Sequence, residues 1–364
     1  MKPVMLDHLP IGLLDLAADQ VHTQLDGPTV IHLPGRAPRP LVVSVLQHGN
    51  ETSGWEAIRR LLKGKYQRDV LPRSLFLIIG NVKAAAENVR YLPNQPDLNR
   101  CWPGSTHPKT LWHKVLDEIT QHVKKFEPFG SIDIHNNTGK NPHYAAVNSI
   151  EPRQLQLASE FSRVVVCFTE PRGVQSQAFG QFCPAVTLEC GLSQDSSGSD
   201  HAMAYLERVL HMESLPETFP TPDCLELYQM LATIHVSPSL AFDFQPLDNP
   251  AHPNIEQDKT IGATDGVLHL LADLDIYNFQ EWPRGFQLAH YTGHEDPPLI
   301  AKGHNGEDLT DQCFEWSNGR VIARMPLMTA MLTLDPFAVR HDCLCYVMER
   351  LNLHALAEGI DQYT

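Results

Sequence analysis

Three side chains in this sequence could hold a metal ion at an active site. His48 and Glu51 lie three residues apart in the segment His48-Gly49-Asn50-Glu51, and His135 follows much later in the chain. Two imidazoles and one carboxylate leave a fourth zinc position open for water, as in catalytic rather than structural zinc sites. A zinc ion held this way lowers the pKa of its water to about 7 and polarises the carbonyl under attack. These residue types therefore point to metal-assisted hydrolysis.

The segments before these residues indicate how a fold would bring them together. Residues 41–46 form a short apolar, β-branched run that ends just before His48, and residues 130–135, with Ile132 and Ile134, form a second run that ends at His135. Both runs are typical of buried strands in a parallel sheet. In open α/β sheets, ligands bind outside the carboxyl ends of the strands. We therefore expect His48, Glu51 and His135 to meet at one edge of a sheet.

Strands and helices are predicted to alternate over roughly residues 40 to 212. The predicted strands are 41–46, 74–81, 130–135, 164–167 and 185–191, and the predicted helices are 55–63, 111–126, 155–162 and 201–212. This alternation is typical of an α/β fold with a mainly parallel central sheet flanked by helices. The first forty residues are interpreted as an edge hairpin or a leading segment.

The last part of the chain has a different pattern. From about residue 220 onward, short apolar runs are separated by glycine-containing turns, and Asn318-Gly319 between two such runs is a hairpin signal. We therefore predict two domains, a hydrolase domain over residues 1–219 and a smaller β-rich C-terminal domain over residues 220–364.

The composition excludes several classes of partner. The 364 residues carry a net charge of −15, which disfavours nucleic acid, because phosphate binding needs clustered Lys and Arg. The first twenty residues lack the basic start and apolar core of a signal peptide, and no uninterrupted apolar run is long enough to span a membrane. None of the eight cysteines forms a CxxC pair. We expect a cytoplasmic protein with reduced thiols that acts on a small molecule. The protein could also form a homo-oligomer.

Three further motifs carry charged residues that would suit the same site. Arg90-Tyr91 comes shortly before Asp97-Leu98-Asn99-Arg100, and Glu189 lies within the predicted strand Thr187-Leu188-Glu189-Cys190-Gly191. A carboxylate inside a buried strand is costly unless it has a partner. A water molecule held by a metal would be such a partner for Glu189.

The motifs taken in order resemble those of the succinylglutamate desuccinylase/aspartoacylase family, which belongs to the zinc carboxypeptidase superfamily. The order is HGNE, NxxAxxxxxRY, DLNR, DxH and TLECG, and it covers about residues 41 to 191. Each motif is short, but their combination in this order is highly specific. The resemblance implies a mixed central sheet of the zinc carboxypeptidase type and one zinc ion per chain.

The resemblance also implies a role for each residue. His48, Glu51 and His135 match the zinc ligands, and Glu189 matches the general base that activates water and then protonates the leaving amine. Arg90 matches the arginine that stabilises the oxyanion, and Asn99 and Arg100 match the pair that binds the substrate carboxylate. Arg172 is a candidate for fixing the acyl group.

Several residues keep a second interpretation. Arg90 and Arg100 could form surface salt bridges, Glu189 could pair with a buried arginine, and Arg172 could be a turn residue beside Pro171. For Asp97 a structural role is favoured, and Asp133 could orient His135 or lie at the surface. Asn136 and Asn137 could bind substrate or form a turn, and His143 is a rival third ligand. His143 follows Pro142 and is therefore expected in a loop.

Hydrolysis of an amide in a small carboxylate-bearing molecule, such as an N-acyl amino acid, is the leading functional hypothesis. The alternative within enzymes is a zinc carboxypeptidase that acts on short or modified peptides, because it would use the same central residues. A non-catalytic metal- or carboxylate-binding protein is a third hypothesis. The presence of Glu189 argues against it, since a binding protein does not need the base.

Overall fold

The computed structural model describes residues 2–246, 266–293, 297–303 and 305–358. The chain separates into two compact units. Unit 1 comprises Met1–Asn137, His143–Tyr228 and Leu351–Thr364, and unit 2 comprises Thr138–Pro142 and Gln229–Arg350.

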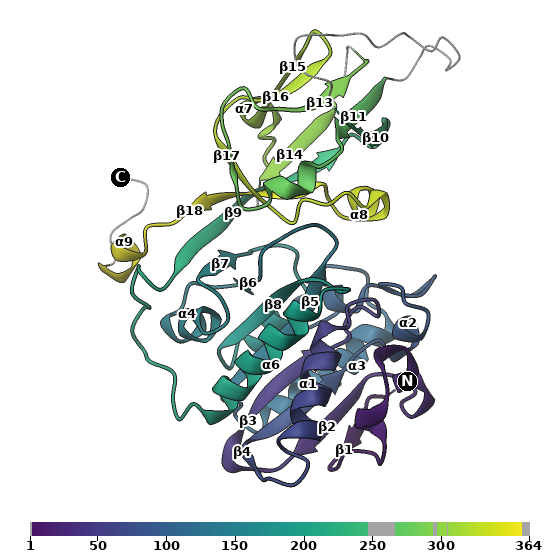
Figure 1. Cartoon of the computed structure of the whole chain (residues 1–364), viewed down its shortest axis with the longest axis vertical. Helices are drawn as coiled ribbons and strands as arrows, with labels where there is room; N and C mark the ends of the chain where they lie inside the picture. Colours follow the sequence, from purple (N-terminus) through teal and green to yellow (C-terminus); the bar gives the residue numbers. More distant parts are fainter. Residues whose placement is uncertain (1, 247–265, 294–296, 304, 359–364) are drawn as a thin grey trace. The chain divides into compact units, whose positions relative to one another are not determined.

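Unit 1 contains a mixed sheet whose strands run mainly parallel (Figure 1). In spatial order the strands are β1 (Val4–Leu6), β2 (Thr29–Leu33), β4 (Leu71–Ile79), β3 (Gly35–Val45), β5 (Gly130–Asn137), β8 (Ala185–Leu192), β6 (Tyr144–Val147) and β7 (Val164–Cys167). The neighbours β4, β3, β5 and β8 are parallel to one another, whereas the β2–β4 and β6–β8 pairs are antiparallel. The predicted α/β fold with a mainly parallel, mixed sheet is confirmed.

Helices cover both faces of this sheet. The helices α1 (Ser53–Gly64), α4 (Pro152–Ser159) and α6 (Ser196–His211) share one hydrophobic core with the sheet, and α3 (Leu111–Lys124) and α5 (Gln175–Phe179) share a second. In β3, Val43 belongs to the first of these cores and Val42 to the second, because successive residues of a strand point to opposite faces. Shorter elements of unit 1 are η1 (Leu13–Asp15), η2 (Ala18–Thr23), α2 (Val82–Ala86), η3 (Leu98–Arg100) and α9 (Leu353–Glu358).

The start of the chain departs from the sequence prediction. The prediction of an edge hairpin within the first forty residues is wrong. Strands β1 and β2 pair in parallel, and both β2 and β3 pair with β4. The segment from Gly35 to Pro40 is the first half of β3. The β3–β4 register shifts between Ala37 and Leu41, and such irregular pairing tolerates the two prolines of this segment.

Unit 2 is rich in strands, as predicted for the C-terminal part of the chain. One group of paired strands comprises β9 (Glu226–Val236), β14 (Leu299–Gly303), β18 (Cys345–Arg350), β17 (Leu327–Ala330) and β12 (Glu281–Trp282). A five-stranded sheet has the order β10 (Ala241–Gln245), β11 (Val267–Leu271), β13 (Gln287–Tyr291), β16 (Arg320–Ala323) and β15 (Phe314–Ser317). The remaining elements are η4 (Leu274–Tyr277), α7 (Thr310–Cys313) and α8 (Pro336–His341).

The predicted Asn-Gly hairpin joins the antiparallel strands β15 and β16. Asn318 and Gly319 have φ values of 51° and 74°. Two consecutive positive φ values are the requirement of the tight turn that suits the twist of a hairpin. Within the described part of the chain, no helix is long and apolar enough to cross a membrane.

Candidate active site

Two neighbouring strands of unit 1 position the three proposed metal ligands. His48 and Glu51 lie in the loop between β3 and α1, and His135 lies near the end of β5. Because β3 and β5 are adjacent and parallel, their carboxyl ends meet at one edge of the sheet. All three side chains are buried, so water competes little with the interactions among them.

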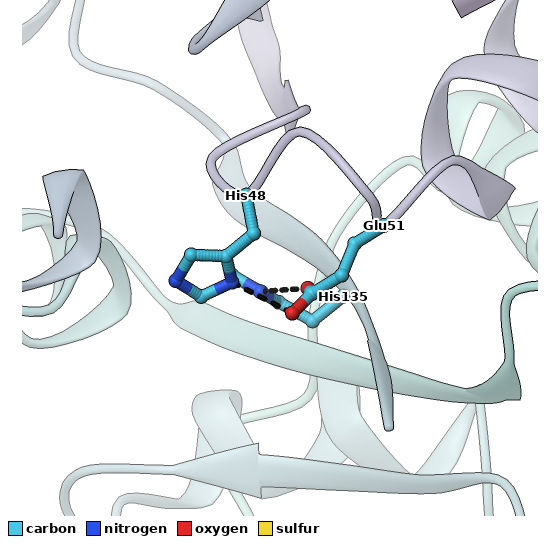
Figure 2. Close-up of side chains that lie close together, drawn as sticks. All are labelled: His48, Glu51 and His135. Carbon is cyan, nitrogen blue, oxygen red and sulfur yellow. Dashed lines mark hydrogen bonds and ion pairs between the residues drawn. The ribbon is translucent and has the colours of Figure 1, made fainter. Parts of the chain in front are cut away.

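The side chains converge on the carboxylate of Glu51 (Figure 2). Nδ1 of His48 lies 2.8 Å from Oε1 of Glu51, and Nδ1 of His135 lies 2.7 Å from Oε2. One ligand atom from each of the three residues lies within 4.8 Å of the other two. This is the spacing expected of atoms that can share one metal ion.

A second carboxylate holds the far nitrogen of each imidazole. Oδ1 of Asp97 lies 2.9 Å from Nε2 of His48, and Oδ2 of Asp133 lies 2.9 Å from Nε2 of His135. Metal-binding histidines commonly donate their other ring N–H to a carboxylate, which fixes the tautomer and the ring orientation. In this arrangement both histidines present Nδ1 toward the proposed metal position.

The electrostatics of these residues suit a cation. Burial opposes ionisation of Glu51, but the imidazoles of His48 and His135 hold the pKa of its carboxyl well below the usual range. Burial likewise opposes protonation of His135, but Asp133 and Glu51 raise the pKa of its imidazole well above its usual value. The site therefore favours positive charge beside the Glu51 carboxylate. A donor set of two imidazoles and a carboxylate fits a zinc ion with an open position.

Arg90 lies within the same cluster of charges. Its Nη2 lies 3.0 Å from Oδ2 of Asp97, and its Nη1 lies 3.3 Å from Oε1 of Glu51. The side chain is 29% exposed. Its neighbours in the structure are thus site carboxylates rather than surface residues.

Glu189 is the next buried carboxylate on the sheet. It pairs in register with His135 across the β5–β8 ladder, so the two side chains lie on the same face. Burial raises the pKa of Glu189 to about 8, with the carboxylates of Glu51 and Asp133 adding to the effect and His135 and Arg90 opposing it. A carboxyl group that titrates near neutral pH can both accept and return a proton, as a general acid–base group must.

Asn99 and Arg100 lie in η3 beside the cluster. Asn99 is buried, with Nδ2 3.2 Å from Nε2 of His135 and Oδ1 accepting a hydrogen bond of 3.0 Å from the backbone N–H of Gln175. Arg100 donates from Nη1 to the carbonyl of Asn99 at 2.9 Å. The structure thus places Asn99 against a proposed metal ligand, and the substrate-binding role of both residues stays a prediction.

Arg172 is less closely tied to the cluster. The carbonyl of the next residue, Gly173, accepts a hydrogen bond from the backbone N–H of Trp102, which brings this loop to the segment after η3. The Arg172 side chain is 57% exposed, and its Nε lies 3.2 Å from Oε1 of Glu170. Its role toward an acyl group stays a prediction.

The residues with two sequence interpretations occupy defined positions. Asp97 is in contact with His48 and Arg90, and it also accepts the backbone N–H of Asn99 at 2.8 Å. Asp133 is fully buried. His143 stacks on His201 and is not part of the metal-ligand cluster found among the described residues.

Asn136 and Asn137 both end strand β5 and contact protein groups. The backbone N–H of Asn136 donates to Oε2 of Glu51 at 3.1 Å, and its side chain binds Ser53 and the carbonyl of Gly191. Nδ2 of Asn137 donates to Oε2 of Glu189 at 2.5 Å. Sequence reasoning missed these contacts. The alternation of side chains along β5, which puts Asn137 on the same face as His135, was the available signal.

Comparison with known families identifies the class of this domain. Residues 39–212 match the model of the succinylglutamate desuccinylase/aspartoacylase catalytic domain. The matched segment contains the second part of β3, which leads to the ligand loop, and all of β8, which carries Glu189. Residues 39–212 therefore belong to this family, and the resemblance of the sequence motifs is confirmed. No curated protein sequence matches the chain significantly.

Solved structures of the same kind share the fold over most of the chain. The succinylglutamate desuccinylase from Chromobacterium violaceum is 16% identical, with a TM-score of 0.52 and coverage of 87% of each chain. The product-bound ectoine utilization protein EutE (DoeB) from Ruegeria pomeroyi is 17% identical, with a TM-score of 0.54 and 88% coverage of each chain. Murine aminoacylase 3 is 15% identical, with a TM-score of 0.54, and the match covers 87% of this chain and 96% of that chain. At these identities the likeness establishes a common fold.

Proposed function

We propose that this protein is a zinc-dependent hydrolase that cleaves the amide bond of a small carboxylate-bearing substrate such as an N-acyl amino acid. The observation that carries the proposal is the convergence of His48, Glu51 and His135 on one position, with ligand atoms within 4.8 Å of one another. The family of residues 39–212 supports it. We further propose that residues 1–219 form the catalytic domain, that residues 220–364 form the β-rich C-terminal domain, and that the protein is cytoplasmic.

In this proposal His48, Glu51 and His135 hold one zinc ion per chain, and Asp97 and Asp133 keep both imidazoles in the required tautomer. Zinc supplies a Lewis acid that polarises the substrate carbonyl and lowers the pKa of water to about 7. Burial keeps bulk water from screening the charges of these residues.

The other side chains act on the substrate. Glu189 takes a proton from the attacking water and returns it to the leaving amine, which its pKa of about 8 allows near neutral pH. Arg90 places fixed positive charge where the oxyanion develops, and such charge is typically worth several kcal/mol. Arg100 with Asn99 binds the substrate carboxylate, for which the planar guanidinium offers a forked set of donors. Arg172 contacts the acyl group.

The direct test is a substrate panel with the purified, zinc-loaded protein. N-acyl amino acids that differ in acyl group and amine are compared with peptides that have a free C-terminus. The proposal expects release of the acyl group from at least one N-acyl amino acid, loss of activity on chelation and recovery with zinc. Cleavage of the peptides alone would establish a carboxypeptidase instead. Zinc binding without turnover of any substrate would establish a binding protein.

A further inference from the structure

The hydrogen bond between Asn137 and Glu189 has no place in the chemistry proposed so far. Nδ2 of Asn137 donates to Oε2 of Glu189 at 2.5 Å. Both side chains are buried, with exposed fractions of 6% for Asn137 and 8% for Glu189. A buried hydrogen bond from an amide to a carboxyl oxygen is stronger than the same bond in water, because water does not compete for either partner. The contact therefore restrains the carboxylate of Glu189.

The β5–β8 ladder explains how the two side chains meet. His135 and Glu189 pair in register, but the register then shifts, and Asn137 pairs with Leu192. The strand β8 thus has one more residue than β5 over this stretch, which is a β-bulge. Gly191 within the bulge has a φ of 69°, a value that favours glycine. Bulges beside active sites re-aim a side chain, and here Asn137 is directed at Glu189.

The neighbouring residue shows that this contact is distinct from the support of the metal ligands. Asn136 uses its side chain on Ser53 and on the carbonyl of Gly191, and its backbone N–H on Glu51. Successive residues of a strand point to opposite faces, so Asn136 contacts the ligand loop and the start of α1, whereas Asn137 contacts Glu189. Asn136 therefore supports the loop that carries the metal ligands, and Asn137 holds Glu189.

We infer that Asn137 is a positioning residue for the reaction, which holds Oε2 of Glu189 by a hydrogen bond and so fixes the direction of Oε1 toward the reacting groups. No hydrogen bond joins Oε1 of Glu189 to another residue in the described part of the chain. A glutamate has three side-chain torsions, and a free carboxylate would sample several orientations of which few suit proton transfer. The inference rests on the proposed function, since it assigns Glu189 its work as base.

Two substitutions of Asn137 test the role of the donor. Asn137→Ala removes the side chain beyond Cβ, and Asn137→Asp keeps the shape but replaces the N–H donor by an acceptor. For both variants we expect kcat to fall about 10- to 100-fold, as for other small misplacements of a catalytic group. The KM for the best N-acyl amino acid and the zinc content of the protein should stay within about twofold of wild type, because neither substrate binding nor metal binding depends on this contact.

The combination with Glu189→Gln separates positioning from a general structural effect. If Asn137 acts through Glu189, then Asn137→Ala changes the residual rate of the Glu189→Gln protein by less than about twofold. Gln154→Ala is the matched control, because Gln154 is a buried amide of α4 that accepts a hydrogen bond from Ser149. This control should lower the melting temperature comparably and leave kcat unchanged.

The outcomes distinguish this inference from the proposed function. A wild-type protein that hydrolyses no N-acyl amino acid contradicts the proposed function itself. A wild-type protein that is active and inactivated by Glu189→Gln, but unaffected by Asn137→Asp, overturns the inference and leaves the function standing. Equal losses of kcat from Asn137→Ala in the wild-type and Glu189→Gln backgrounds also overturn it.

Discussion

Oδ1 of Asp97 lies 2.9 Å from Nε2 of His48, and the other oxygen of the same carboxylate accepts hydrogen bonds from Arg90. One partly buried side chain thus connects a proposed metal ligand with the arginine proposed to stabilise the oxyanion. Burial opposes the ionisation of Asp97, but His48, Arg90 and Arg100 hold the pKa of its carboxyl well below the usual range. Asp97 is therefore an anion throughout the neutral pH range and can orient both partners.

This relationship predicts that Asp97→Asn weakens zinc binding. An asparagine can fill the same space, but it is a poorer acceptor for the His48 N–H and carries no charge for Arg90. Loss of such a partner typically costs 10- to 100-fold in metal affinity, which competition with a chromophoric chelator measures. Asp195→Asn is the control, because Asp195 caps the start of α6 through Ser197 as Asp97 caps Asn99. Equal zinc affinities in wild type and Asp97→Asn would refute the orienting role.

Glu189 predicts a pH dependence of stability in the metal-free protein. Its pKa is raised from 4.5 to about 8, so the folded state binds this proton more tightly than the unfolded state. The stability that this proton contributes is fully present below pH 4.5 and is lost as the pH rises through about 8. Glu189→Gln is neutral at every pH and lacks this loss.

The measurement is the melting temperature of both metal-free proteins between pH 5 and about pH 9. The difference between Glu189→Gln and wild type should grow in favour of the variant as the pH rises. Groups that do not interact with Glu189 are common to both proteins and cancel in the difference. His135 does not cancel completely, because its charge lowers the pKa of Glu189. A flat difference between the two proteins would mean that the pKa of Glu189 is not raised in the folded state.

The sequence predicted the strand ends that carry the metal ligands, because hydrophobic runs and the residues directly after them are local features. The structure has β3, β5 and β8 where the apolar runs lie. The contact of Asp97 with His48 spans 49 residues and depends on how a loop folds back, which no local pattern encodes. The Asn137–Glu189 contact depends on a bulge, and periodicity alone predicts no register shift. The short elements β6 and α5 were missed. Strand β7 is no longer than β6, but it was predicted because it is a continuous apolar run of three valines and a cysteine.

The value of kcat should fall even when Arg90 is replaced by a residue of the same charge. Arg90 uses Nε and Nη2 on Asp97 and Nη1 on Glu51, and a lysine ammonium cannot reproduce this fork. We expect Arg90→Lys to lower kcat about 10²- to 10³-fold, as the loss of an oxyanion donor does in other hydrolases. Arg59→Lys on α1 is the control, because it makes the same exchange at a partly buried arginine that pairs with Glu56. A wild-type kcat in Arg90→Lys would show that point charge alone suffices or that Arg90 does not contact the oxyanion.

Arg100 and Arg172 should differ in their effect on substrate binding. Arg100 lies next to buried Asn99 and donates to its carbonyl, whereas Arg172 is mostly exposed and pairs with Glu170. A substrate carboxylate therefore gains more from Arg100, where less water competes for the guanidinium. We expect Arg100→Ala to raise KM by one to two orders of magnitude, about the cost of one charged hydrogen-bond partner, and Arg172→Ala to raise it by a smaller factor.

Changes in the substrate show most directly which group Arg100 binds and which group Arg172 contacts. If Arg100 binds the carboxylate of the amino acid, replacing that carboxylate by an amide should raise the KM of wild type but change the Arg100→Ala protein little. If Arg172 contacts the acyl group, its removal should instead alter the preference among acyl groups. Glu170→Gln frees Arg172 from its partner while keeping its charge, so it should not reproduce the effect of Arg172→Ala. A larger KM effect at Arg172 than at Arg100 would reverse the two proposed assignments.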